Sequence, residues 1–156
     1  MVILDNGEGR ERMQQMNGIP VHITFSSDIQ DQDEKVHFSF ETNGLYYIKD
    51  QKSYLLFEEK LEEQGPVKTT VRFGADEAWI RRSGSVNMRI PFKLHHETKG
   101  IHETPHIKLE VTATTDDISH DWDEQHRAGF FRLTYRLSMR GEEVGTYFLQ
   151  IAFKEE

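Results

Sequence analysis

The sequence contains no cysteine, and this absence excludes disulfide bonds, zinc sites built from thiolates and thiol nucleophiles together. No segment approaches the roughly 20 consecutive apolar residues that a membrane-spanning helix requires. Residues 1–18 also lack the basic start and apolar centre of a signal peptide, although residues 10–16 could form a short helical turn. We therefore expect a poorly ordered N-terminal tail over residues 1–18 and a cytoplasmic protein with no membrane partner.

Positive charge is in the minority. Nineteen Lys and Arg residues stand against 27 Asp and Glu residues, which gives a formal net charge of −8. Binding to nucleic acid or to an anionic lipid surface depends on positive charge that neutralises phosphates. The charge balance therefore predicts neither nucleic acid nor membrane as a partner, and only a local basic patch would change this prediction.

Apolar residues that alternate with polar ones dominate the chain from residue 19 onward. Residues 131–139 and 147–153 show the pattern most clearly, with Phe, Leu, Tyr, Met or Ile at every second position. This period of two is typical of strands that bury one face of an antiparallel sheet. About ten candidate strands of this kind follow one another, and no helical pattern is long enough for a βαβ unit. We therefore predict a single all-β domain over residues 19–156.

Short turns separate these candidate strands. Residues 43–44 are Asn-Gly, the pair most typical of a tight hairpin, and we predict a turn there. The polar residues 49–53, the Ser-Gly pair at 83–84 and residues 140–143 predict further hairpins. The charged residues 58–64 are expected to hold a helical turn. Strands that are neighbours in the sequence are therefore expected to be neighbours in the sheet.

About eight to ten hairpin-linked strands make a sheet that curls, because twist accumulates across it and closure removes exposed edges. Two architectures satisfy this condition: an up-and-down antiparallel barrel and a sandwich of two sheets. The run of sequential hairpins favours the barrel.

Four segments carry a resemblance to a known family: residues 44–59, 67–73, 81–92 and 132–137. The best-matching residues are Tyr46, Tyr47, Lys49, Tyr54, Leu55, Arg82, Ser83, Gly84, Val86 and Met88. In register over residues 21–153, the chain resembles the YwiB-like family of small bacterial proteins. The resemblance implies a calycin-type, lipocalin-like β-barrel with no assigned activity. None of the matching motifs is a catalytic signature, so the resemblance concerns the fold rather than the chemistry.

Trp79, Arg81 and Arg82 are the candidate ligand-binding residues. If residues 83–84 form a two-residue turn, Trp79 and Arg81 face the barrel interior near an open end. A guanidinium there could anchor the carboxylate or phosphate of a ligand. If the turn is three residues long, Ile80 faces inward and Arg81 lies in solvent. The sequence leaves both registers open.

Tyr46, Tyr47 and Tyr54 are the candidate residues for protein contacts. Tyr46 and Tyr47 point to opposite faces of one strand, so neither face is plainly polar. The outer face could be covered by residues 58–64, by the N-terminal tail or by a second copy of the chain. Because the first two offer little apolar surface, we favour a symmetric homodimer.

Four of the eight histidines, His95, His96, His102 and His106, lie close together in the sequence. Their spacing matches no closed zinc motif, so we expect solvated side chains rather than a metal site. The acidic residues 121–124 lack the glycine that an EF-hand calcium loop requires, and we expect a polar hairpin end there. We therefore predict no metal and no cofactor.

Three functions remain open. The chain has no G-x-S-x-G motif and no glycine-rich phosphate loop, so no catalytic residue is predicted and an enzyme is the third candidate. The first candidate is a barrel that binds a small apolar or anionic ligand at one end. The second is a structural or interaction barrel with a filled core. The bulky inward side chains favour a filled interior with a shallow end pocket at most.

Overall fold

The structure of the protein, a computed structural model, describes residues 18–61 and 65–156, and each regular element in these ranges is a β-strand. The strands are β1 (Ile19–Asp31), β2 (Glu34–Lys49), β3 (Lys52–Leu61), β4 (Gly65–Phe73), β5 (Glu77–Gly84), β6 (Asn87–Lys93), β7 (Glu97–Glu103), β8 (Lys108–Asp123), β9 (Ala128–Met139) and β10 (Glu142–Glu155). None of the described residues belongs to a helix that could cross a membrane. The predicted tail lies outside the described residues except for Gly18.

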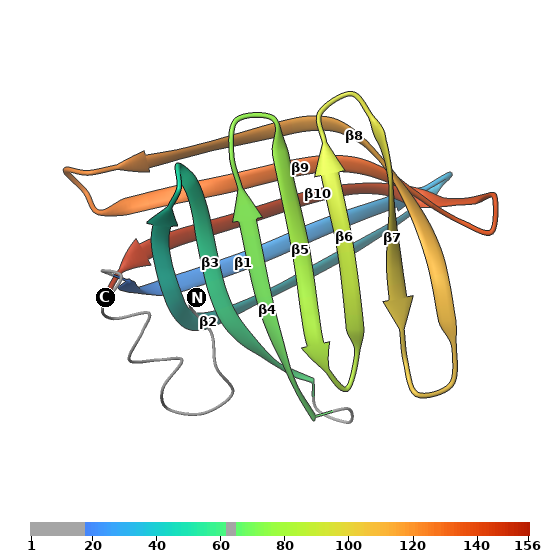
Figure 1. The fold of residues 1–156 in the computed structure, drawn as a ribbon, viewed down its shortest axis with the longest axis horizontal. Helices are drawn as coiled ribbons and strands as arrows, with labels where there is room; N and C mark the ends of the chain where they lie inside the picture. Colours follow the sequence, from blue (N-terminus) through green and yellow to red (C-terminus); the bar gives the residue numbers. More distant parts are fainter. Residues whose placement is uncertain (1–17, 62–64) are drawn as a thin grey trace.

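The strands close into one antiparallel barrel in the order β1-β10-β9-β8-β7-β6-β5-β4-β3-β2. Each strand pairs with its neighbours in sequence, and β1 pairs with β10 to complete the ring. In Figure 1 the shorter strands β4 to β7 cross the long strands β1, β9 and β10 at a steep angle, so the barrel is flattened into two layers. The predicted up-and-down barrel is confirmed, and the open sandwich is excluded.

Two predicted hairpins have the backbone that their sequences indicate. Asp50 and Gln51 join β2 to β3 with φ values of 52° and 66°, and Arg140 and Gly141 join β9 to β10 with 52° and 79°. Two consecutive positive φ angles are the mark of a type I′ turn, whose twist matches that of the flanking strands. These turns set the register of the hairpins on either side.

The turn predicted at Asn43-Gly44 is wrong. Strand β2 continues through both residues, and Gly44 pairs with Val21 on one side and with Phe57 on the other. A Cβ atom at Gly44 would lie 2.2 Å from the carbonyl oxygen of Leu56. Glycine is needed here for close approach of neighbouring strands rather than for a turn.

The helical turn predicted for residues 58–64 is also wrong where it can be seen, because residues 58–61 continue β3. Residues 62–64 and the helical turn expected at residues 10–16 lie outside the described residues.

The interior is filled by the apolar side chains that alternate along the strands. Phe73 and Phe131 stack with ring centroids 4.6 Å apart and are almost inaccessible to solvent. The other fully buried large side chains include Phe92, Ile23, Leu55, Leu133 and Ile151. This packing agrees with a barrel whose diameter is just sufficient for its own side chains. A ligand would therefore contact the outer surface or the ends of the barrel.

Candidate functional site

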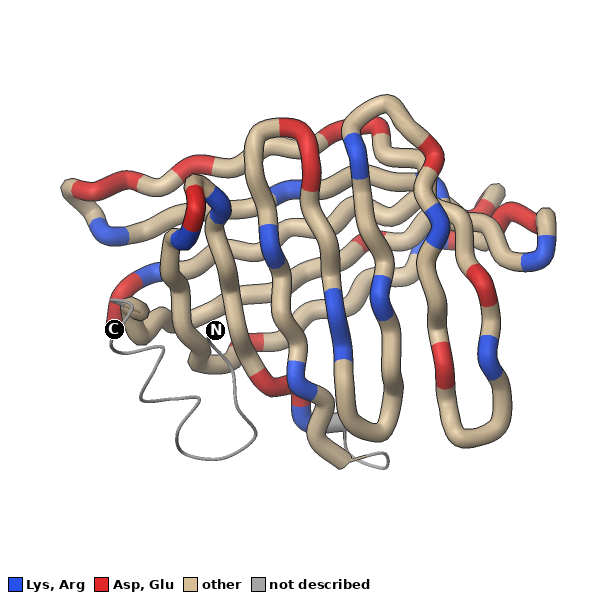
Figure 2. The backbone as a smooth tube through the Cα atoms, in the orientation of Figure 1, with Lys and Arg blue, Asp and Glu red and all other residues tan. Residues whose placement is uncertain are grey.

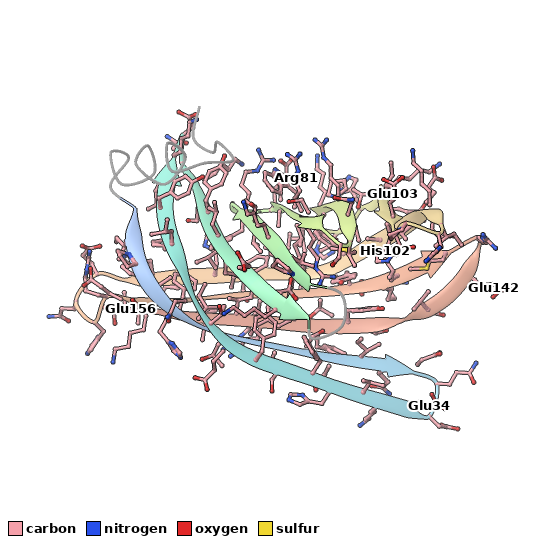
Figure 3. The ribbon with its side chains drawn as sticks, turned by 90° about the horizontal axis from the view of Figure 1, so that it is seen from below. Glu34, Arg81, His102, Glu103, Glu142 and Glu156 are labelled. Atoms are coloured by element: carbon pink, nitrogen blue, oxygen red, sulfur yellow. The ribbon has the colours of Figure 1, made fainter. Side chains whose placement is uncertain are left out.

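The β5–β6 hairpin determines where the candidate arginines point. Arg82 is the last residue of β5 that pairs with β6, so residues 83–87 connect the two strands. Ile80 lies inside the barrel with 7% of its surface exposed. Trp79 and Arg81 therefore face outward, and the register with a two-residue turn is wrong. Figure 3 shows Arg81 projecting from the outer surface, while His102 lies on the inner side of the sheet.

A hollow of about 220 Å³ lies on the outer side of this hairpin. Its lining residues are Arg81, Arg82, Ser83, Asn87, Met88, Arg89, Ile101 and Glu103. Arg81 stands directly opposite Arg89 in the β5–β6 ladder, and both side chains are exposed. Among residues 18–61 and 65–156, neither has a carboxylate within 4.0 Å. Like charges directly opposite each other destabilise a sheet, so this pair concentrates uncompensated positive charge.

Arg82 is in a different environment, because it points into the barrel and is held by Glu59. Its Nε donates a hydrogen bond to Glu59 Oε2 at 3.0 Å, and its Nη2 donates to Oε1 at 3.1 Å. The Thr69 hydroxyl also donates to Glu59 Oε2, at 2.5 Å. The side chains of Arg82 and Glu59 are only 22% and 8% exposed. The charge of Arg82 is therefore neutralised inside the protein, and Arg81 is the predicted arginine that remains available to a ligand.

His102 and Tyr135 lie near enough to this buried ion pair for the charge of Arg82 to affect them. Burial lowers the pKa of His102, and the positive charge of Arg82 lowers it further. Burial also raises the pKa of Tyr135 well above its ordinary value, and the Tyr135 ring stacks on Tyr147 with centroids 4.9 Å apart. The inner side of this barrel end therefore carries one compensated ion pair among uncharged side chains.

Trp79 lies two residues from Arg81 on the same outer face and joins a row of aromatic rings. The guanidinium carbon of Arg72 is 5.1 Å from the centre of the Trp79 ring. The Tyr54 ring meets Trp79 edge to face at 6.4 Å. Tyr54 in turn stacks on Tyr47 at 4.8 Å with an interplanar angle of 1°. An aromatic row therefore runs across β2 to β5 beside the arginine pair.

The tyrosines considered for protein contacts occupy two environments. Tyr46 points inward, where it contacts Trp122 and Phe153 with ring centroids 4.7 and 4.8 Å away. Tyr47 points outward but is only 3% exposed, and burial raises its pKa to about 12. Tyr46 is thus a core residue, and Tyr47 with Tyr54 belongs to the aromatic row.

The homodimer was expected from an apolar patch on this hairpin. The large exposed apolar side chains among the described residues are Val36, Phe38, Ile48, Ile101, Ile107 and Phe148. Of these, Ile48 alone belongs to the hairpin of residues 45–57, so its tyrosines do not form such a patch. The homodimer stays a prediction that these side chains do not support.

The four clustered histidines are spread over different parts of the sheet. His95 and His96 lie in the β6–β7 turn, His102 lies inside and His106 lies in the β7–β8 turn. No group of three or more His, Asp or Glu side chains within the described part of the chain is placed to hold a metal ion. Asp123 lies at the end of the β8–β9 hairpin, where it contacts the His126 ring at 2.6 Å.

No imidazole in residues 18–61 and 65–156 is hydrogen-bonded to a serine or threonine hydroxyl. His22 and His37 instead contact the exposed carboxylates of Glu41 and Asp28 at 2.8 and 2.6 Å. The hydrogen bond that the His22 ring donates to the Glu41 carboxylate raises the pKa of His22. The geometry therefore offers an anion-binding surface more clearly than a nucleophile with its base.

Comparison with known proteins shows the family of this chain. Residues 23–151 match the family described as a domain of unknown function, DUF1934. The chain belongs to this family. It is 29% identical over 142 residues to the uncharacterized beta-barrel protein YwiB of Bacillus subtilis (strain 168), covering 91% of this chain and 96% of that protein. It is also similar to the crystal structure of the ywiB protein from Bacillus subtilis, with a TM-score of 0.78, 27% identity, and coverage of 89% and 93%.

The comparisons confirm the family that the sequence resembles, and the closed barrel agrees with the calycin-type shape that the resemblance implies. Neither the description of the family nor the name of its relative assigns a ligand or a reaction.

Sequence reasoning missed two parts of the site. Alternation along β6 places Arg89 outward, but its position opposite Arg81 depends on the length of the connecting turn. Glu59 lies within the charged residues 58–60, which suggests a solvated segment. Its place in the alternation of β3 could have identified it, because Glu59 lies an even number of residues from Leu55 and Phe57 and therefore points inward with them.

Proposed function

We propose that this barrel binds a small anionic ligand on the outer face of the β5–β6 hairpin. The observation that carries the proposal is the Arg81–Arg89 pair, which stands cross-strand with no carboxylate within 4.0 Å among the described residues. Such a pair costs stability in the free protein, and a bound anion offsets that cost. Arginine suits this task because its planar guanidinium forms paired hydrogen bonds with carboxylate and phosphate groups.

The remaining residues of the hollow restrict the class of ligand. Ser83 and Asn87 offer hydroxyl and amide donors to an anion, and Ile101 offers an apolar surface that is 44% exposed. Glu103 offers an acceptor for an O–H or N–H group of the ligand. At about 220 Å³, the hollow is smaller than the 300–1,000 Å³ of typical ligand pockets. It fits one charged group and its nearest substituents, as in a cytoplasmic phosphorylated compound whose remainder extends over the surface.

Inorganic phosphate is the probe for this proposal. Thermal unfolding is measured with increasing phosphate while chloride keeps the ionic strength constant, because screening alone changes the stability of charged surfaces. We expect a saturable rise in Tm, as for any ligand that binds only the folded state. Arg81→Gln and Arg89→Gln should each abolish this rise. Arg132→Gln removes an exposed arginine from β9 and is the matched control, which should retain it.

The two arginine variants have a second signature. Without phosphate, each removes one member of a repelling pair, so its Tm should equal or exceed that of the native protein at low salt. A phosphate-dependent rise that survives in both variants would overturn the proposal, since the anion would then bind elsewhere.

A further inference from the structure

The outer surface of β4, β5 and β6 concentrates positive charge in a chain whose net charge is −8. This surface, here named the basic face, contains Lys68, Arg72, Arg81, Arg89 and Lys93 at outward positions. The one carboxylate at an outward position of these three strands is Glu77, 3.9 Å from Lys93 at the edge. Figure 2 shows basic segments on each of these neighbouring strands, with an acidic segment at the β4–β5 turn. The overall charge therefore conceals a local basic patch.

Aromatic rings lie beside these cations, one two-residue step along the strands from the Arg81–Arg89 pair. Arg72 and Trp79 are direct neighbours across the β4–β5 ladder, and Arg81 follows two residues along β5. Two residues along a strand correspond to about 7 Å. Trp79 therefore lies about 7 Å from the row that contains the Arg81–Arg89 pair, and Tyr54 extends the aromatic row across β3. A ligand that alternates anionic groups with flat rings would contact both rows at once.

We infer that the basic face binds single-stranded nucleic acid, with a backbone phosphate at the Arg81–Arg89 pair and a base against Trp79. This inference rests on the proposed anion site and extends it to a polymer. Proteins that bind single strands combine a positively charged surface for the backbone with aromatic side chains on which bases stack. The basic face has both components, and its arginines can also stack on bases.

Three other polyanions fit the surface less well. A double helix hides its bases, and it is read by a helix or a two-stranded ribbon that enters a groove, whereas this face is the outside of a barrel wall. An anionic membrane favours exposed apolar side chains that insert below the headgroups, but none of the large exposed apolar side chains among the described residues lies on β4, β5 or β6. An acidic peptide would pair with the arginines and leave the aromatic row unused.

The size of the basic face predicts a short binding site with a measurable salt dependence. The cations cover three adjacent strands, or about 10 Å across the sheet, and the four-residue step from Lys68 to Arg72 adds about 13 Å along it. Each phosphate neutralised on a single strand contributes about −0.7 to the slope of log K against log salt concentration. One phosphate at the Arg81–Arg89 pair and a second at Arg72 therefore predict a slope of about −1.4.

The test uses fluorescein-labelled homopolymers of about ten nucleotides, in RNA and DNA forms, with fluorescence anisotropy on the full-length protein. We expect saturable binding that weakens with salt as above. Arg81→Gln/Arg89→Gln should lower the affinity more than tenfold and make the slope about 0.7 less negative, because the phosphate at the pair is no longer neutralised. Arg132→Gln should change neither quantity.

Trp79 supplies the readout that separates stacking from charge. Trp79→Leu should lower the affinity about tenfold while leaving the salt slope unchanged, because it removes a stacked base but no cation. If circular dichroism shows that Trp79→Leu does not fold, Trp79→Phe replaces it as the variant. A separate Trp122→Phe protein keeps Trp79 as its one tryptophan, and binding should quench the fluorescence of that protein. Preferential binding of RNA over DNA, or equal binding of both, would each support the inference, since the backbone phosphate is common to them.

The failures of this inference and of the proposed anion site are distinguishable. If inorganic phosphate binds at the arginine pair but the oligonucleotide binds no more tightly than a mononucleotide, the nucleic-acid assignment is overturned and the anion site stands. If neither phosphate nor oligonucleotide binds, both are overturned. Equal affinity for a poly-glutamate peptide or for phosphatidylserine vesicles, with no effect of Trp79→Leu, would also overturn the assignment to nucleic acid.

Discussion

Replacing Glu59 with glutamine should destabilise the barrel strongly, because Arg82 would remain charged inside it without an anion. Glu59 accepts two hydrogen bonds from Arg82 and one from Thr69. The glutamine side chain keeps the shape and can still accept the bond from Thr69, so the lost charge is the main change. Breaking a buried ion pair costs about 3–5 kcal/mol. Because Arg82 is 22% exposed and water hydrates part of it, we expect about 2–4 kcal/mol.

The double variant separates this mechanism from simple loss of packing. Arg82→Gln leaves Glu59 unpaired at 8% exposure and should be at least as damaging as Glu59→Gln. In Glu59→Gln/Arg82→Gln neither member of this pair carries a charge. Its loss of stability should therefore be smaller than the sum of the two single losses, with a coupling energy above about 1 kcal/mol. Thr69→Val, which removes one hydrogen bond and no charge, should cost only about 1 kcal/mol beyond its packing change.

Urea unfolding followed by tryptophan fluorescence measures all four variants. With m values of about 1–3 kcal/mol/M, a loss of about 3 kcal/mol lowers the urea midpoint by about 1–3 M. Two additive single losses would refute the reasoning, since they would show that the buried charges do not depend on each other. So would a Glu59→Gln midpoint equal to that of the native protein.

Three further results are expected. Burial and the charge of Arg82 lower the pKa of His102 in the fold, so the unfolded chain takes up this proton first as the pH falls. The stability due to neutral His102 is therefore complete above about pH 6.5 and decreases below it, and His102→Gln should reduce the fall of the urea midpoint below pH 6.5. Gly44→Ala should lower stability by about 1–3 kcal/mol or more in thermal unfolding, whereas Gly74→Ala, whose Cβ meets the flexible end of Lys52 at 3.0 Å, should be nearly neutral. Burial raises the pKa of Tyr47 to about 12 and raises the pKa of Tyr135 well above its ordinary value. In an ultraviolet titration to about pH 11, the native protein should therefore ionise fewer than its five tyrosines, whereas the protein unfolded in urea should ionise all five.

The strands could be predicted because a half-buried strand must alternate. Residues 131–139 and 147–153 correspond to β9 and β10, and the glycine at position 141 marks the turn between them correctly. Gly44 misled because a glycine that supplies a positive φ and a glycine that makes room for a neighbouring chain look alike in a sequence. The atom that requires Gly44 is the carbonyl oxygen of Leu56, which is near it only after β2 and β3 have paired.

The sequence named Arg81 as a candidate residue but did not determine the face of the sheet on which it lies. Changing the length of one turn moves Arg81 from the inner face of β5 to the outer face, because the side chains of a strand alternate. The hydrophobic pattern is compatible with both lengths of the β5–β6 turn, and only the burial of Ile80 distinguishes them. Arg82 was identified as a ligand contact, yet its charge is matched by Glu59, which lies 23 positions away in the chain. Pairing between distant positions is the information that alternation does not contain.

The seam between β1 and β10 has a consequence for how the protein is made. Val21 pairs with Glu155 and Gln30 with Thr146, so one wall of the barrel joins the first described strand to the last. On the ribosome, β1 can pair with β2 early, but its other edge has no partner until the 14 residues of β10 emerge. Until that moment the nascent chain is an open sheet with unpaired backbone groups at both edges, which is the form most prone to pair with another chain. Emergence of β10 is therefore the event that turns an aggregation-prone sheet into a closed barrel.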